Sequence, residues 1–438
     1  MTLRTRAPNR SRLLDLALAT VLVAITFWRL VPAIDSTEFH RDEARWIGNS
    51  AILREWRNPF GSLWQDEGYR NRYGTYDEST RRRNQPPLAM YLIGFGMLLQ
   101  GEGLPTTGYW IMNQDTRWNS DQGNLPSAAE LEAGRRTNVV IAVLTVVALY
   151  ILGTRLTNRV GGMAAALLYA LHPLVRTTST RAWSDPLLVL LIVLAGLAAV
   201  RLADRPTWGR AVVLGVVLGL GAATKLSPLA VAAALGVGGL TLWGIGRAGS
   251  TASARLRTLG LRLAGVPAIA ALTFVAVYPY LWNNPVAHLY RMYAFRALTF
   301  DQQATGFTAA AVPNRGDAFR RIGHELGDRF STSGFVAEEL EQLLGHEIWV
   351  AIDHLDLVVA VFGLLLLLAF VVREGIASPT ALAAAVVAGH ALLIVLTMRV
   401  EFARYLLPVV LFVAVAFGIA VGVGWSWICS TTLGRWRG

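Results

Sequence analysis

Long runs of apolar residues alternate with short polar segments along most of this chain. Ten of these runs are read as membrane-spanning helices, for which roughly 20 apolar residues are needed. They lie at residues 14–34, 136–153, 160–176, 186–202, 211–224, 227–246, 263–282, 355–372, 380–398 and 405–428. The pattern therefore predicts an all-α, polytopic membrane protein of about ten transmembrane helices, with residues 1–438 forming a single membrane domain.

Two long polar segments, residues 35–135 and 283–354, separate these runs. In the second, VAHLYRMYAFRAL (286–298) and GDAFRRIGHELGDRF (316–330) have the pattern of amphipathic helices on a membrane surface. In the first, LAMYLIGFGMLLQ (88–100) would form a helix only about 20 Å long, against a hydrocarbon core of about 30 Å. We therefore expect an interfacial or re-entrant helix at 88–100, and two long extracytoplasmic loops that carry interfacial helices.

Positive charge follows the alternation of spans and loops. The chain is 54% hydrophobic and 16% charged, and its net charge of +11 comes almost wholly from Arg, since Lys225 is the only Lys. In the short loops and the C-terminal tail, twelve Arg fall on one side of the predicted bilayer and five cations on the other. We therefore expect both termini and the Arg-rich loops on the cytoplasmic side of a bacterial-type plasma membrane, next to anionic lipids. Nucleic acid is not expected as a partner, because the cations are not gathered on one face.

The first polar segment opens with FHRDEARWIGNS, residues 39–50, directly after the first predicted span. Helical spacing places Asp42, Arg45, Trp46 and Asn49 on one face, so a carboxylate, a cation and a flat ring share a surface. A solvated helix with local ion pairs on the membrane surface is the plainer alternative. The position of Asp42 favours a functional role, because a rigid span can aim it at a membrane-held substrate.

The same Asp-Glu pair occurs twice more in this loop, at residues 66–67 and 77–78. Both copies lie among Gly, Tyr and Asn residues, which are typical of flexible loops. We therefore expect the chemistry at residues 42–43 rather than at either copy.

Cations at the outer ends of spans form a second group of candidate residues: Arg181, Lys225, Arg399 and Arg404, with Asp185 beside them in sequence. A cation at membrane depth can cost on the order of 3 kcal/mol, so a shared anionic partner explains them economically, although each alone could be a snorkelling interfacial residue. No His, Asp or Glu spacing matches a tight metal-ligand signature. We therefore expect no metal or other cofactor, with a divalent cation as the minor alternative.

The chain resembles the C-type, membrane-embedded glycosyltransferases (GT-C), closest to the protein O-mannosyltransferase and aminoarabinose (lipid A) transferase group, glycosyltransferase family 39-like. No single motif is specific, but their order and spacing match that group. The motifs are DEAR at 42–45, NQPPLAMYL at 84–92, the segment TRAWSDPLLVLLIVLAGLA from residue 180, VLGLGAATKLSPL at 217–229 and ARYLLPVVL at 403–411. Gln85 departs from the pattern, since the family often has His or Lys before its Pro-Pro pair.

The resemblance implies a role for each residue that matches these motifs. Asp42 would be the catalytic base, Glu43 its acidic partner and Asp185 a second functional acid. The expected substrate-binding residues are Arg45, Gln85, Arg181, Lys225, Arg399, Arg404 and Tyr405.

The resemblance also implies the reaction: an inverting transfer of a sugar, for instance mannose, from a polyprenyl-phosphate-linked donor to a hydroxyl at the extracytoplasmic membrane face. The acceptor would belong to a protein, a lipid or a glycan. In such a displacement one carboxylate base suffices, and the leaving phosphate, already anionic, needs cations rather than a general acid. The alternative is a transporter or flippase of an anionic lipid-linked substrate, which needs the cations but no base.

Overall fold

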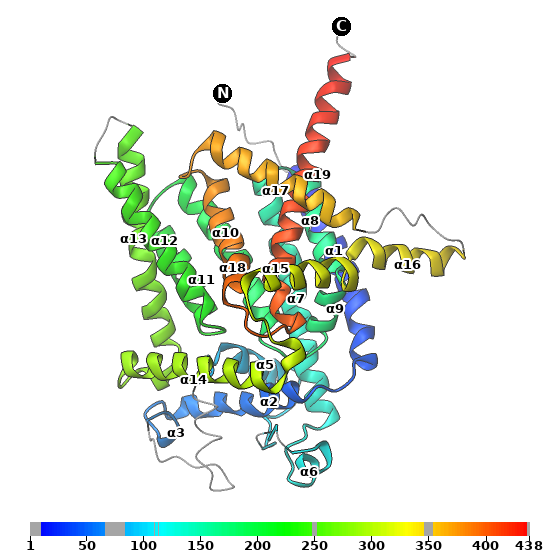
Figure 1. The fold of residues 1–438 in the computed structure, drawn as a ribbon, viewed down its shortest axis with the longest axis vertical. Coiled ribbons are helices and arrows are strands. Elements are labelled where there is room, and N and C mark those ends of the chain that lie inside the picture. The colour runs from blue at the N-terminus through cyan, green and yellow to red at the C-terminus, as the bar shows by residue number, and fades with distance from the viewer. Residues whose placement is uncertain are drawn as a thin grey trace.

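The structure is a computed structural model in which nearly all regular elements are helices (Figure 1). Within the described part of the chain, the one β pairing is an isolated antiparallel bridge between Ala311 and Val400. The residues described are 10–65, 84–108, 110–112, 114–247, 252–345 and 354–435.

Eight helices in the described residues are long and apolar enough to cross a membrane. The prediction of an all-α, polytopic membrane protein is therefore confirmed. These helices are α1 (Arg10–Ser36), α7 (Ala128–Leu156), α10 (Asp185–Asp204), α12 (Ser227–Ile245), α13 (Ala252–Ala276), α17 (Leu355–Glu374), α18 (Pro379–Thr397) and α19 (Leu407–Arg435).

Two of the ten predicted spans are formed by shorter apolar helices, α8 (Arg159–Leu171, 13 residues) and α11 (Trp208–Ala222, 15 residues). α8 ends early because Pro173 has no N–H and restricts the residue before it to an extended conformation. His172 accordingly has ψ 129°, and a separate short helix, α9 (Pro173–Ser179), follows it. Hydropathy alone could not show this break, because the apolar run continues through it.

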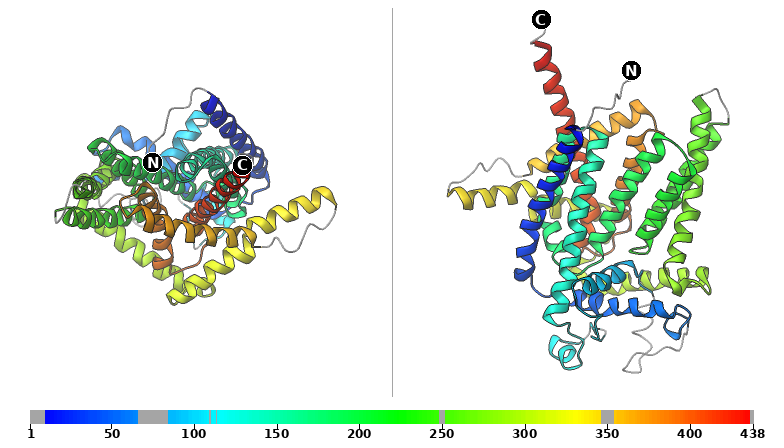
Figure 2. Two further views of the ribbon diagram at one scale, coloured as in Figure 1. Left: turned by 90° about the horizontal axis from the view of Figure 1, so that it is seen from above. Right: turned by 180° about the vertical axis from the view of Figure 1, so that it is seen from behind.

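Three helices lie across one end of the bundle, nearly at right angles to the long helices (Figures 1 and 2). They are α2 (Arg41–Ser50), α5 (Leu88–Leu99) and α14 (Pro285–Gly306). With 12 residues α5 is about 18 Å long, too short to cross a bilayer, as its sequence predicts. α1 begins and α19 ends at the opposite end of the bundle (Figures 1 and 2).

The remaining elements are short or lie along the sides of the bundle. The expected amphipathic helix at 286–298 falls within α14, and the one at 316–330 is divided between α15 and a π-helical turn, η4. The Asp-Glu pairs at 66–67 and 77–78 lie outside the described residues. The remaining elements, which complete the described structure, are η1 (Ala51–Arg57), α3 (Ser62–Gln65), α6 (Thr116–Asp121), η2 (Pro279–Leu281), η3 (Thr308–Ala310), α15 (Arg315–His324), η4 (Glu325–Arg329), α16 (Thr332–Leu344) and η6 (Ala403–Leu406).

Close glycine contacts fix α19 against α8. A methyl group added at Gly418 would lie 2.5 Å from the backbone oxygen of Gly161, so neither position has room for a side chain. Small residues of this kind let membrane helices approach closely and gain van der Waals contact. The contact matters for the site because η6, which carries Arg404, leads directly into α19.

Candidate active site

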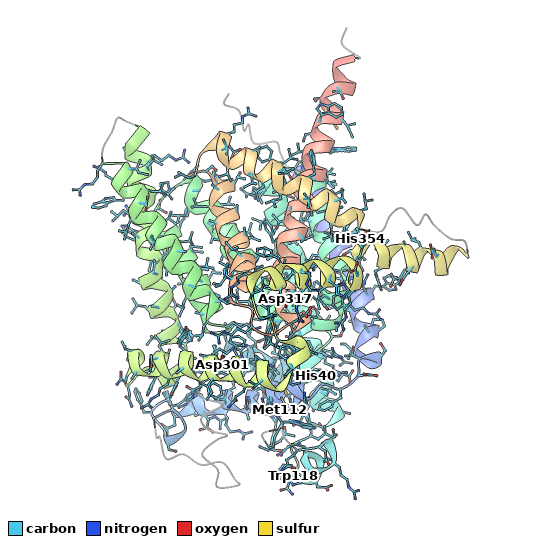
Figure 3. All side chains as sticks on the ribbon, viewed as in Figure 1. His40, Met112, Trp118, Asp301, Asp317 and His354 are labelled. Atoms are coloured by element: carbon cyan, nitrogen blue, oxygen red, sulfur yellow. The ribbon has the colours of Figure 1, made fainter. Side chains whose placement is uncertain are left out.

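The N-terminus of α2 is capped by its own sequence. The Nδ1 atom of His40 accepts a hydrogen bond from the Asp42 N–H at 3.1 Å, and Glu43 Oε2 accepts one from the His40 N–H at 3.0 Å. Burial lowers the pKa of His40, which keeps the imidazole neutral and its Nδ1 able to accept. Figure 3 shows His40 at the end of the bundle where α2 and α14 lie. This reciprocal cap holds the Asp42 backbone in a fixed orientation.

Asp42 forms an ion pair with Arg404, which lies 362 residues later in the chain. Both side chains are mostly shielded from solvent, at 20% and 17% exposure. Burial by itself raises the pKa of Asp42, but the charge and hydrogen bond of Arg404 outweigh it, so this pKa is lower than that of an ordinary Asp. The carboxylate is therefore ionised at neutral pH.

A second acid–cation pair lies beside the first. Lys225, in the turn between α11 and α12, places its Nζ atom 2.6 Å from Oδ1 of Asp185, in the first turn of α10. Lys225 also lies over the ring of Tyr405, 4.7 Å from its centroid, and the Arg404 guanidinium lies 5.4 Å from the same centroid. Tyr405 therefore joins the two ion pairs into one cluster.

Two further residues complete the cluster. Arg296, on α14, donates a hydrogen bond from its guanidinium to the Tyr405 hydroxyl at 3.2 Å. The ring of Trp183 lies under Arg404, 4.9 Å from the guanidinium carbon to the ring centroid, and under Arg181 at 5.1 Å. Burial lowers the pKa of Arg181, the expected effect of removing a cation from water.

We call Asp42, Asp185, Lys225, Arg296, Arg404 and Tyr405 the ion cluster. Three cations face two carboxylates in it, so it carries a surplus of positive charge. An anion such as a phosphate is the chemical partner that such a cluster favours.

Glu43, next to Asp42, has different surroundings. It is 0% exposed, and its Oε1 atom lies 2.9 Å from Nε of Arg135 on α7, which is itself 5% exposed. The same oxygen accepts the backbone N–H of Ala182 at 3.1 Å. The guanidinium of Arg135 also donates to the backbone oxygens of Ile34 and Thr37. This network ties α1, α2, α7 and the segment before α10 together behind Asp42.

Three other predicted site residues, Arg45, Gln85 and Arg399, have described partners outside the ion cluster, although the charge of Arg45 also helps to lower the pKa of Asp42. Arg45 donates from Nε to the backbone oxygen of Trp110 at 3.3 Å. The backbone oxygen of Gln85 accepts a hydrogen bond from the Tyr278 hydroxyl at 3.3 Å. Arg399 is half exposed and forms an ion pair with Asp301, which Figure 3 shows on α14. Sequence position alone therefore gave no basis for separating Arg399 from Arg404.

Sequence reasoning missed three residues with close contacts at the site: Arg135, Trp183 and Arg296. Trp183 lies inside the TRAWSDP motif, and Arg135 lies beside the predicted start of a span, so a signal existed for both. Arg296 lies in an amphipathic segment with other Arg residues, and no local pattern distinguishes it.

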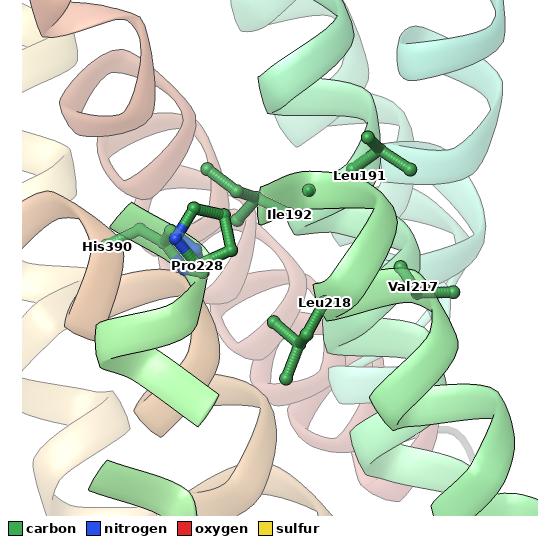
Figure 4. A pocket seen from close by; sticks show the side chains of 7 residues that line it. Leu191, Ile192, Val217, Leu218, Pro228 and His390 are labelled. Carbon is green, nitrogen blue, oxygen red and sulfur yellow. The ribbon is translucent and has the colours of Figure 1, made fainter. Parts of the chain in front are cut away.

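An apolar pocket lies elsewhere, between α10, α11, α12 and α18 (Figure 4). Its lining includes Leu191, Leu218 and Pro228, with His390 as the one polar side chain among the seven residues around it. The ion cluster contributes none of that lining, and we place the candidate site by its charged groups. Within the described residues, no three His, Cys, Asp or Glu side chains are grouped as metal ligands would be.

The whole chain has a fold similar to that of a known membrane glycosyltransferase. The Archaeoglobus fulgidus oligosaccharyltransferase AglB, in complex with an inhibitory peptide and a dolichol-phosphate, matches with a TM-score of 0.56 at 14% identity, over 97% of this chain and 52% of that one. This chain thus spans about half the length of the archaeal enzyme. The chain therefore shares the fold of this oligosaccharyltransferase.

A match in sequence narrows the resemblance. Residues 128–243 match the family described as dolichyl-phosphate-mannose-protein mannosyltransferase, a region that contains Arg181, Asp185 and Lys225. No curated protein sequence matches the chain.

Two more solved structures are similar at lower scores. ArnT from Cupriavidus metallidurans, bound to undecaprenyl phosphate, gives a TM-score of 0.49 at 16% identity, over 94% of this chain and 60% of that one. The S. cerevisiae protein O-mannosyltransferase Pmt1-Pmt2 complex, bound to the sugar donor, gives 0.43 at 20% identity, over 64% and 35%.

Proposed function

We propose that this protein is an inverting glycosyltransferase that moves a sugar from a polyprenyl-phosphate-linked donor to a hydroxyl acceptor. The observation that carries the proposal is the Asp42–Arg404 pair within the ion cluster: an ionised carboxylate next to surplus cations. The match of residues 128–243 to a lipid-phosphate-dependent mannosyltransferase family supports it. The dolichol-phosphate bound to the structurally similar AglB supports the lipid-phosphate class of donor.

In the proposed reaction, Asp42 takes the proton of the acceptor hydroxyl. The acceptor oxygen attacks the anomeric carbon from the face opposite the phosphate, a new C–O bond forms, and the bond from that carbon to the phosphate oxygen breaks. Polyprenyl phosphate leaves with the bonding electron pair, and Lys225 and Arg404 stabilise its charge. A positioned base of this kind contributes roughly 10²- to 10⁴-fold.

Arg404 has two anionic partners in this scheme. Without donor it pairs with Asp42, which lowers the basicity of the carboxylate. The donor phosphate competes for the guanidinium, so binding of the donor would release Asp42 and raise its pKa toward that of an ordinary Asp. The base would thus be most basic when the donor is in place.

The other predicted site residues take supporting roles in the proposal. Asp185 positions Lys225 through their 2.6 Å contact, and Glu43 positions α2 through Arg135. Arg181, Arg296 and Tyr405 hold or extend the cationic surface around the phosphate. For Arg45, on α2, and for Gln85 and Arg399, in the loops beside the cluster, we keep the expectation of substrate contact.

We further propose that the end of the bundle that carries α2 and α14 faces the extracytoplasmic side, with both termini cytoplasmic. The excess of Arg in the opposite loops supports this orientation. In this arrangement residues 35–135 and 283–354 are the two extracytoplasmic loops of one membrane domain.

A transfer assay with purified protein, polyprenyl-phosphate-linked mannose and a panel of hydroxyl acceptors tests the proposal. Asp42→Asn keeps the shape of the side chain but removes the base, and we expect transfer to fall by about 10²-fold or more while donor binding persists. Full activity of a folded Asp42→Asn variant would overturn the mechanism. A flippase would move labelled lipid between leaflets in vesicles without forming a glycosidic bond.

A further inference from the structure

Five Arg side chains gather around the C-terminal end of α10, on α10 itself and on the neighbouring helices α11 and α13. Figure 1 shows α13 beginning at the end of the bundle opposite α14, far from the ion cluster. The proposed reaction uses none of the five. We call Arg201, Arg205, Arg210, Arg255 and Arg262 the arginine group.

Hydrogen bonds place four members of the group at the last turn of α10. Arg210, on α11, donates from its guanidinium to the backbone oxygens of Arg201 and Arg205. Arg255, on α13, donates to the backbone oxygen of Ala203 at 2.9 Å. The side chains of Arg201, Arg205 and Arg255 are exposed. Two guanidinium groups from neighbouring helices therefore converge on an end of α10 that carries two more cations.

The fifth member, Arg262, is held by an aromatic ring. Its guanidinium carbon lies 4.3 Å from the ring centroid of Trp208, the first residue of α11. A methyl group added at Gly265 would lie 2.8 Å from the same ring, so Trp208 packs closely against α13 and still remains 47% exposed. Within the described part of the chain, Nε of Arg262 is buried without a hydrogen-bond partner. The ring thus fixes a cation beside the end of α10.

The positive charge of the arginine group exceeds what its surroundings neutralise. Among the residues that the structure describes, none of the ion pairs involves a member of the group. In residues 201–210 and 252–265 the single acidic residue is Asp204. The C-terminus of α10 adds about half a negative charge, so about 1.5 negative charges face five cations. Capping of α10 explains two of the hydrogen-bonded groups but leaves this surplus.

The length of α10 places the arginine group one membrane thickness from the ion cluster. α10 begins at Asp185, a member of that cluster, and its 20 residues extend about 30 Å. The hydrocarbon core of a bilayer is also about 30 Å thick. Trp is enriched at the level of the lipid head groups, which is where Trp208 then lies. The arginine group therefore reaches the head groups of the leaflet opposite the ion cluster.

We propose that the arginine group and Trp208 form a binding site for the head group of an anionic phospholipid. A guanidinium donates two parallel hydrogen bonds to a phosphate, and basic surfaces between membrane helices bind acidic head groups. A zwitterionic phospholipid carries its own cation and leaves the surplus charge in place, so a lipid of net negative charge is favoured. The site is independent of the proposed transfer reaction, since it needs neither donor nor acceptor.

Two phospholipids that differ in net charge test the site. The full-length protein in detergent is titrated with phosphatidylglycerol or phosphatidylcholine, and bound lipid is counted by native mass spectrometry. The wild type should bind phosphatidylglycerol more tightly. Arg262→Gln removes one charged donor and should weaken binding of phosphatidylglycerol roughly tenfold, with a much smaller effect on phosphatidylcholine. Equal affinity of the wild type for the two lipids would overturn the site.

Arg257→Gln is the matched control. It removes the same charge from the same helix, but five residues place the two side chains about 140° apart around α13. Arg257 is exposed and lies outside the arginine group. Its loss should leave the affinity for phosphatidylglycerol close to that of the wild type. An equal loss in Arg257→Gln and Arg262→Gln would show that positive charge in general, and no defined site, attracts the lipid.

Arg205→Gln keeps the proposal testable if Arg262→Gln unfolds the protein. Its described hydrogen bond to Arg210 uses the backbone oxygen, which the substitution retains. We expect an unchanged thermal midpoint without added lipid, and a reduced affinity for phosphatidylglycerol. An unchanged affinity in a folded Arg205→Gln or Arg262→Gln variant would overturn the site and leave the arginine group a structural role.

Discussion

Arg404, in the turn that leads into the last transmembrane helix, forms an ion pair with Asp42, near the start of the first helix beyond α1. The pair joins opposite ends of the sequence at one end of the bundle. It also links a cation suited to a phosphate with a carboxylate suited to a base. Each property can be tested separately.

The acid limb of the pH–rate profile should depend on Arg404. Arg404 lowers the pKa of Asp42, and the base acts only when deprotonated, so the wild type should keep its activity until the pH falls below the ordinary Asp range. Arg404→Gln removes this effect, and burial then raises the pKa, so activity should be lost at a higher pH. Measurement of kcat/KM against pH checks this.

The matched control for this profile is Arg320→Gln. Arg320 is 77% exposed and pairs with Asp317 on its own helix, α15. Its acid limb should coincide with that of the wild type. An unshifted limb in Arg404→Gln would show that Asp42 does not titrate as the base.

The buried Glu43–Arg135 pair should act on stability rather than on the chemistry. Glu43→Ala leaves the guanidinium of Arg135 buried without its carboxylate, which should lower the free energy of unfolding by about 3 kcal/mol or more. The double variant Glu43→Leu with Arg135→Met removes both charges and should recover much of that loss. Thermal midpoints in detergent check both variants; a double variant less stable than Glu43→Ala would contradict the explanation.

Lys225 should contribute to binding the lipid phosphate. Lys225→Met removes a charged hydrogen-bond donor and should weaken binding of polyprenyl phosphate about tenfold. It also leaves Asp185 buried without its cation, so stability should fall as well. Adding Asp185→Asn should restore the thermal midpoint but not the affinity. Recovery of both would mean that Lys225 acts only by neutralising Asp185.

The glycine contact between α8 and α19 should limit the size of the residue at position 418. Gly418→Ala places a methyl group 2.5 Å from the Gly161 backbone oxygen, which should lower stability by about 1–3 kcal/mol and disturb the position of Arg404. Gly424→Ala, on the same helix, meets no heavy atom within 4 Å and is the control. Its thermal midpoint should be unchanged or slightly raised, since Ala favours helix. Equal effects of both changes would exclude the packing explanation.

Most of the architecture was predictable because hydropathy is a local property. Apolar runs predict helices wherever they are long enough, and the eight membrane-length helices lie where those runs lie. The predicted single span at residues 160–176 is instead divided into two helices, and the cause is local too. Pro173 ends α8 inside an apolar run, which a count of apolar residues does not register.

The site was predictable only as a set of candidates. Motif order identified Asp42, Asp185, Lys225 and Arg404, which lie in the ion cluster. Its position at the outer end of a span made Arg399 an equal candidate, although that side chain pairs with Asp301.

The sequence by itself determined that the protein is a helical, polytopic membrane protein, and it located most of the helices and the loops in which the polar residues lie, since these follow from composition and spacing. The tertiary structure decided which charges meet. Asp42 and Glu43 are neighbours of the same chemical type, but they leave α2 about 100° apart. One faces Arg404, and the other is buried against Arg135. Arg404 lies hundreds of residues after Asp42, and Arg135 lies tens of residues after Glu43. Only the packing of the bundle brings these two arginines to α2.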